Sequence, residues 1–110
     1  MDQTSPFLLV KSLETQVNAI LSALDIYSLP ADERRSIRLL KNSLVDARLD
    51  IREYELSETR DEQLRCAKLA KKRLEHVRTY ILLASEYNIF GAVDVAQLTA
   101  NVERISERLL

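Results

Sequence analysis

The chain has 110 residues, of which 46% are hydrophobic and 30% charged, and its formal net charge at pH 7 is −1. This length predicts one domain over residues 1–110, and the single cysteine, Cys66, excludes a disulfide within the monomer. The near-neutral charge gives no general affinity for nucleic acids or anionic membranes, so binding to either would need a local basic patch.

The first predicted helix covers residues 6–27. Ser5 is a suitable N-cap and Pro6 fits the first helical position. The apolar residues that follow recur at spacings of three and four, as on a helix that buries one face. They are Leu9, Leu13, Val17, Ile20, Leu24 and Tyr27.

The second predicted helix covers residues 30–56. Ser28-Leu29-Pro30 separates the first helix from the second, because proline disfavours helical geometry in the residue before it, here Leu29. Pro30 fits the first turn of the second helix, with Ser28 or Leu29 as cap. The apolar spacing of three and four then resumes. It is carried by Ile37, Leu40, Leu44, Ala47, Ile51 and Tyr54.

The third predicted helix covers residues 60–87. Thr59 and Glu62 have the spacing of a capping box, in which the hydroxyl accepts a hydrogen bond from a free backbone N–H. Its apolar stripe consists of Leu64, Ala67, Leu74, Val77, Ile81 and Ala84.

The fourth predicted helix covers residues 94–109 and follows a turn with the only glycine. Asn88 suits a C-cap, and Gly91 suits a positive φ. Asp94 with Gln97 resembles a second capping box and favours a start there.

Four amphipathic helices joined by short loops predict an all-α, antiparallel up-down-up-down four-helix bundle. The alternative is a long helical hairpin that completes its core by oligomerising. Four leucines lie off the main stripes, and we expect them to face another subunit, so the bundle is predicted to self-associate. They are Leu39, Leu49, Leu56 and Leu83.

The sequence contains no pattern typical of a catalytic site, and we expect no enzyme, cofactor, metal or small-molecule substrate. His76 has no Cys, His or Ser at helical spacing. The Glu-x-x-His motif of di-iron bundles is absent, because Arg73 stands three residues before His76. No segment approaches the ~20 apolar residues that cross a bilayer, and no signal peptide is visible. We therefore expect a cytoplasmic protein without membrane contact.

Basic residues follow one side of the second helix, and Val45 is the only gap in the row. A basic stripe along a helix is suited to phosphate groups. The alternative is an ordinary solvated face, because Asp46 and Asp50 form an acidic strip on the same helix. The stripe consists of Arg34, Arg38, Lys41, Arg48 and Arg52.

From Leu29 to Leu109 the sequence resembles a family of small four-helix-bundle proteins. This family includes Avd, the accessory variability determinant of diversity-generating retroelements, and the 23S rRNA intervening-sequence proteins. The resemblance rests on Leu29-Pro30 followed by basic residues, on two later helical segments and on the last helix. These later parts are Leu64 to Ala70, Leu74 to Ala84, and Val95 to Leu109, which contains Val102-Glu103-Arg104-Ile105.

The resemblance implies a homopentameric bundle that binds a reverse transcriptase and its template RNA to support mutagenic cDNA synthesis. It implies no catalytic residue. The alternative is a helical protein–protein adaptor without nucleic-acid binding, which the slightly acidic net charge favours. The residues that the resemblance would place at the nucleic-acid or polymerase contact are Arg34, Arg35, Arg38, Lys41, Arg48, Arg52, Lys68, Lys71 and Lys72.

Overall fold

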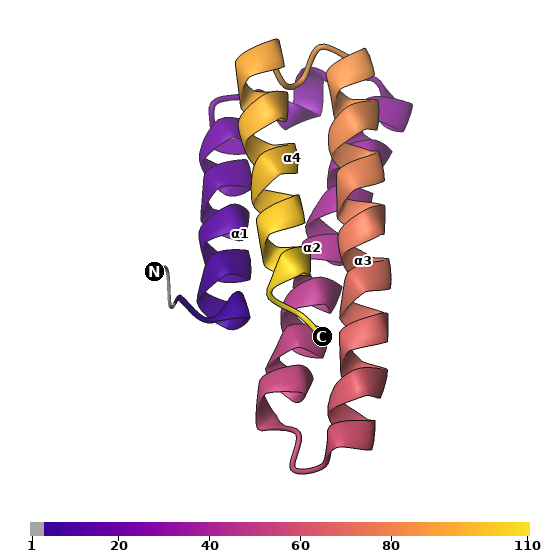
Figure 1. The fold of residues 1–110 in the computed structure, drawn as a ribbon. Coiled ribbons are helices and arrows are strands. Elements are labelled where there is room, and N and C mark those ends of the chain that lie inside the picture. Colours follow the sequence, from indigo (N-terminus) through magenta and orange to yellow (C-terminus); the bar gives the residue numbers. More distant parts are fainter. Residues whose placement is uncertain (1–3) are drawn as a thin grey trace.

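The computed structural model describes residues 4–110, so the first three residues of the predicted domain lie outside the described part. Over this range the chain is all-helical and contains no strand. The prediction of an all-α protein with four helices is confirmed (Figure 1). The helices are α1 (Pro6–Ser22), α2 (Ala31–Leu56), α3 (Arg60–Glu86) and α4 (Ala92–Glu107), with a short 3-10 turn, η1 (Ile26–Ser28), before α2.

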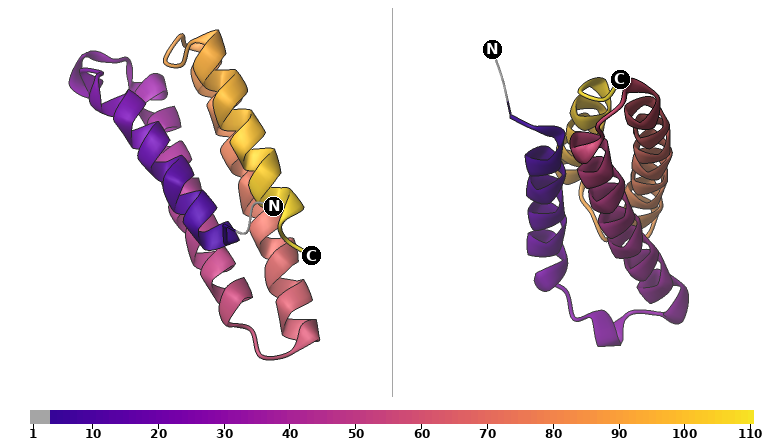
Figure 2. Two further views of the ribbon diagram at one scale, coloured as in Figure 1. Left: turned by 60° about the vertical axis from the view of Figure 1, so that its left-hand side comes forward. Right: turned by 90° about the horizontal axis from the view of Figure 1, so that it is seen from below.

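The four helices lie side by side around one core. Each helix packs against the next along the chain, and α1 also packs against α4. The two views of Figure 2 agree that α1 lies against α2 and that α4 lies against α3. The longer α2 and α3 extend past α1 and α4 at one end (Figure 1). None of the helices in the described part is both long and apolar enough to cross a membrane.

The core consists of one buried row from each helix. The rows of α2 and α3 contain the residues that the periodicity predicts, except that Leu64 of α3 is exposed. In α4 the buried residues are Leu98, Val102 and Ile105. In α1 the buried row keeps Leu13 and Val17 of the predicted row, but Val10 and Leu21 are buried in place of Leu9 and Ile20, because α1 touches both α2 and α4 and its flanks are half-covered. This row consists of Val10, Leu13, Val17 and Leu21, whereas Leu9, Ile20 and Leu24 are half-buried.

The predicted end of the first helix at Tyr27 is wrong. α1 ends at Ser22, and the N–H groups of Ala23 and Leu24 donate to carbonyls three residues earlier, at 3.2 and 3.1 Å. This tighter winding ends the α-helix, and Asp25 is extended. Tyr27 is 91% exposed, so the apolar spacing continues past the last residue that the helix buries.

Side-chain caps begin two of the helices as predicted. The Ser5 hydroxyl accepts from the N–H of Leu8 at 3.2 Å, and the Thr59 hydroxyl accepts from the N–H of Glu62 at 3.2 Å. The predicted cap of α2 is wrong, because Pro30 itself occupies the N-cap position and no side chain there makes a capping bond.

The turn between α3 and α4 departs from the prediction at the glycine. Gly91 has a φ of −75°, and Asn88 instead adopts the left-handed conformation, with a φ of 61°. The N–H of Ile89 then donates to the carbonyl of Ala84 at 2.9 Å, which closes the helix end in a Schellman-type turn. α4 begins at Ala92 rather than at Asp94, and Gly91 is its N-cap.

Candidate nucleic-acid interface

The basic stripe of α2 lies on the flank that faces α1, and its C-terminal half contacts that helix. Nε of Arg48 lies 2.7 Å from Oε1 of Glu14, and both side chains are largely covered. The guanidinium of Arg52 stacks over the ring of Phe7, with 5.0 Å between its central carbon and the ring centroid. These two cations therefore already have partners within the molecule, and a phosphate would have to compete with them.

The N-terminal half of α2 carries the cations that remain available. Arg34, Arg35, Arg38 and Lys41 are exposed. Within residues 4–110 none of these four side chains forms an ion pair. Because these side chains are exposed to solvent, salt screens their charges. Their contribution to phosphate binding would therefore depend strongly on salt concentration.

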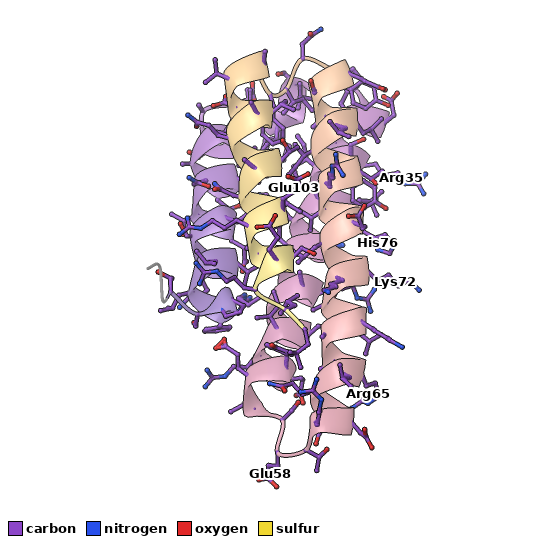
Figure 3. All side chains as sticks on the ribbon, viewed as in Figure 1. Arg35, Glu58, Arg65, Lys72, His76 and Glu103 are labelled. Atoms are coloured by element: carbon purple, nitrogen blue, oxygen red, sulfur yellow. The ribbon has the colours of Figure 1, made fainter. Side chains whose placement is uncertain are left out.

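A second set of cations lies along α3. Lys68 and Lys72 are exposed and Lys71 is half-buried. Figure 3 shows the labelled side chains of Lys72 and Arg35 on one side of the bundle, directed away from it. Arg35 of α2 is thus directed to the side away from α1 (Figure 3), unlike Arg48 and Arg52.

The structure thus divides the predicted site residues into two groups, one on α2 beside α1 and one mainly on α3. One group lies beside α1 and consists of Arg34, Arg38, Lys41, Arg48 and Arg52. The other runs along α3 with Arg35 and consists of Lys68, Lys71 and Lys72. A single straight phosphate backbone cannot follow both groups along one helix face.

Other cations of α3 belong to the surroundings of this second group. Figure 3 places Arg65 and His76 on the same side as Lys72. Sequence spacing could have identified Arg65 as part of this basic face, because Arg65 stands seven residues before Lys72 and both therefore lie on one side of the helix. Arg73 differs, because its Nε donates to Oδ2 of Asp50 on α2 at 3.2 Å.

The described residues contain no group of three or more His, Cys, Asp or Glu side chains that could hold a metal. Two hollows between α1 and α4 have volumes of about 120 and 230 Å³, below the ~300–1,000 Å³ typical of small-molecule sites. Cys66 is buried beside the hydroxyl of Ser57, with 3.7 Å between sulfur and oxygen.

Comparisons with known proteins do not supply a relative. No protein-family model, no curated protein and no solved structure matches this chain. The surface of the molecule and the resemblance between Leu29 and Leu109 are therefore the basis for a functional proposal.

Proposed function

We propose that this chain is a non-enzymatic accessory protein of a diversity-generating retroelement, which binds a reverse transcriptase and its template RNA and so supports mutagenic cDNA synthesis. The resemblance supplies the biological setting. The observation that carries the binding proposal is the cluster of exposed, unpaired cations at Arg34, Arg38 and Lys41 within the described part of the chain. A cytoplasmic location fits such a role.

The two groups of cations suggest two contacts. The α2 group presents its free charges along the first turns of one helix, which suits a stretch of RNA backbone. The α3 group lies on another side and is available to an acidic surface of the polymerase or to a second stretch of RNA. The bundle would then hold its two partners on different faces.

The proposal includes an up-down-up-down arrangement of the helices and self-association. The short connections between consecutive helices support the first. The exposed Leu49 and Leu56 support the second, since large apolar side chains on the surface are typical of interfaces when they cluster. The resemblance implies five copies, and light scattering would then give five times the monomer mass of 12.6 kDa.

RNA titrations at several salt concentrations test the nucleic-acid contact. The double variant Arg38→Glu and Lys41→Glu should weaken binding strongly. The slope of log affinity against log salt should fall by about 0.7 for each phosphate of a single strand that the variant no longer neutralises. The matched control places the same charge change on Arg60 and Arg104, which are exposed outside both groups. Equal weakening in both double variants would contradict a localised site.

A protein–protein adaptor without RNA affinity is the second candidate. The observation in its favour is that Arg48 and Arg52 of the predicted stripe are engaged by Glu14 and Phe7. In that case the wild-type protein should show no salt-dependent RNA binding. It should still co-purify with its protein partner after ribonuclease treatment.

A further inference from the structure

A polar hollow lies between α1 and α2, on the flank of α2 that carries the basic stripe. Its volume is about 210 Å³, below the ~300–1,000 Å³ of small-molecule sites, so it suits one small chemical group rather than a whole ligand. Three of its α1 side chains are exposed, which leaves it open to solvent. We name it the α1–α2 hollow, and it is lined by Lys11, Glu14, Thr15, Asn18 and Arg48.

Helical periodicity brings the α1 members of the hollow together. Lys11, Glu14, Thr15 and Asn18 follow one another at spacings of three, one and three, so they share one flank of the helix. The Thr15 hydroxyl donates to the carbonyl of Lys11 at 3.0 Å, within this flank. Arg48 completes the hollow from α2.

Three cations meet where this flank of α1 contacts α2. Nζ of Lys11 and Cζ of Arg52 lie 5.6 and 5.0 Å from the centroid of the same Phe7 ring. The third cation is Arg48, in the hollow itself. Within residues 4–110, neither Lys11 nor Arg52 forms an ion pair. Neighbouring cations repel one another, so this region favours the entry of an anion.

Two carboxylates lie in the same region, and one of them belongs to the hollow. Glu55 accepts the N–H of Phe7 at 3.1 Å. Glu14 lines the hollow, its side chain is only 17% exposed, and its Oε1 lies 2.7 Å from Nε of Arg48. The carboxylate of Glu14 therefore already occupies the position that an incoming anion would take beside Arg48.

The geometry of the Glu14–Arg48 pair differs from that of the ion pair between α2 and α3. Nε of Arg73 donates a hydrogen bond to Oδ2 of Asp50 at 3.2 Å. Oε1 of Glu14 and Nε of Arg48 are closer and buried, but within the described residues neither atom makes an aligned hydrogen bond. A misaligned pair compensates less of the hydration that its charges lose, so a better-aligned anion can replace it.

From this arrangement we propose that the α1–α2 hollow binds a phosphate group of the RNA backbone, and that the Glu14 carboxylate occupies the site until the phosphate displaces it. The inference rests on the proposed RNA binding and adds a contact to it. Arg48 and Lys11 pair with the phosphate oxygens, and the Asn18 amide donates to them. Without RNA, Glu14 keeps the largely covered Arg48 paired.

The hollow extends the free part of the basic stripe. Arg34, Arg38 and Lys41 are exposed on the same helix. Lys41 stands seven residues before Arg48, which is two helical turns or about 10.5 Å. A strand that follows the free cations along α2 therefore reaches the hollow, and the half of the stripe that contacts α1 belongs to the same binding surface.

RNA titrations of Glu14→Gln test the displacement. Glutamine keeps the shape of the side chain and an acceptor oxygen but removes the charge that competes with the phosphate. Binding of a single-stranded oligoribonucleotide should tighten by about tenfold, the order of one charge-assisted contact. Helicity, measured by circular dichroism, should remain unchanged, because Glu14 lies outside the buried row of α1.

Two further variants separate the hollow from a general effect of charge. Asp46→Asn is the matched control, because it removes one negative charge from an exposed position of α2 outside the hollow. It should change the affinity much less than Glu14→Gln does. Glu14→Gln combined with Arg48→Gln should lose the gain, and the slope of log affinity against log salt should fall by about 0.7 relative to Glu14→Gln alone.

Nuclear magnetic resonance identifies the source of the phosphate. In Glu14→Gln, the oligoribonucleotide should shift the backbone amide signals of Lys11, Thr15 and Asn18. Inorganic phosphate at the same concentration should leave them in place, because it makes none of the contacts that the strand makes along α2.

Three results would overturn the hollow as an RNA site: equal gains in Glu14→Gln and Asp46→Asn, a gain that persists without Arg48, or saturable shifts with inorganic phosphate alone. RNA binding that the Arg38 and Lys41 double variant abolishes and that Glu14→Gln leaves unchanged would overturn the hollow and retain the proposed function. No RNA binding by either the wild type or Glu14→Gln would overturn both.

Discussion

The neighbouring helices α2 and α3 have 26 and 27 residues, and they bury similar rows toward the core, yet they differ elsewhere. α2 exposes Val45, Leu49 and Leu56 on its outward side, whereas α3 exposes mainly charges there. α3 begins with a side-chain cap and α2 does not. The comparison shows that the inward face of each helix determines its place in the fold, while the outward face decides what the helix can bind.

The inward faces differ in size near the α2–α3 connection. α3 contributes the small residues Cys66, Ala67 and Ala70, and α2 contributes the larger Ile51 and Tyr54. These larger residues of α2 and small residues of α3 share this end of the core, level with the first turn of α1, where the N–H of Phe7 donates to Glu55.

Loss of a buried leucine should have the largest effect, and it should be similar in both helices. Leu44 and Leu74 are each 1% exposed, so Leu44→Ala and Leu74→Ala should each lower the free energy of unfolding by about 2–5 kcal/mol. Urea denaturation measures the change. Leu49→Ala on the outward side of α2 should leave the unfolding of the dilute protein nearly unchanged. If Leu49→Ala destabilised the protein as much as Leu44→Ala, this would contradict the distinction between the outward and inward faces of α2.

Enlargement of a small residue tests the packing of α3 against α2. Ala70 is fully buried, and Ala70→Leu should lower the free energy of unfolding by about 1–3 kcal/mol through overpacking. Thermal unfolding measures it, and Lys72→Leu on the exposed side of α3 is the control. An Ala70→Leu variant with an unchanged free energy of unfolding would show that the two helices do not pack closely at this position.

The capping difference between the helices should have a smaller effect. Thr59→Ala removes the bond to the N–H of Glu62 and should lower stability by about 1 kcal/mol. Pro30→Ala at the start of α2 removes no such bond, because no side chain caps that helix. Equal destabilisation in the two variants, measured by urea denaturation, would contradict the assignment of Thr59 as a cap.

The ion pair between the two helices should contribute least. The Arg73 and Asp50 side chains are 39% and 24% exposed, and a partly exposed pair of this kind is worth about 0–1 kcal/mol. Arg73→Gln should therefore lower stability by no more than that, and added salt should reduce the difference. A larger decrease that salt does not change would mean that Arg73 acts through packing.

The sequence predictions were accurate where the interactions that set a feature lie within one helical turn. The caps at Ser5 and Thr59 were predicted correctly, because an N-cap depends on groups within one helical turn. Asn88 was expected near the end of α3, but its positive φ was assigned to Gly91. Both residues tolerate that conformation, and the hydrogen bond of Ile89 to Ala84 selects Asn88.

The candidate interface shows the same difference between local features and contacts between helices. Periodicity correctly placed Arg34, Arg38 and Lys41 on one exposed side of α2. It did not indicate that Arg48 pairs with Glu14 or that Arg52 stacks on Phe7, because both partners lie in another helix.

By itself, the sequence determined the helical class, the number of helices and the residues that line most of the core, because these depend on local periodicity and capping. Tertiary structure decided where α1 ends, which row of α1 is buried and which cations remain free. Those features depend on which helix faces which, and contacts between distant segments set that arrangement. The exposed apolar residues Val45, Leu49 and Leu56 of α2 belong to both levels: their spacing is visible in the sequence, but only the packed bundle shows that the other helices leave them exposed.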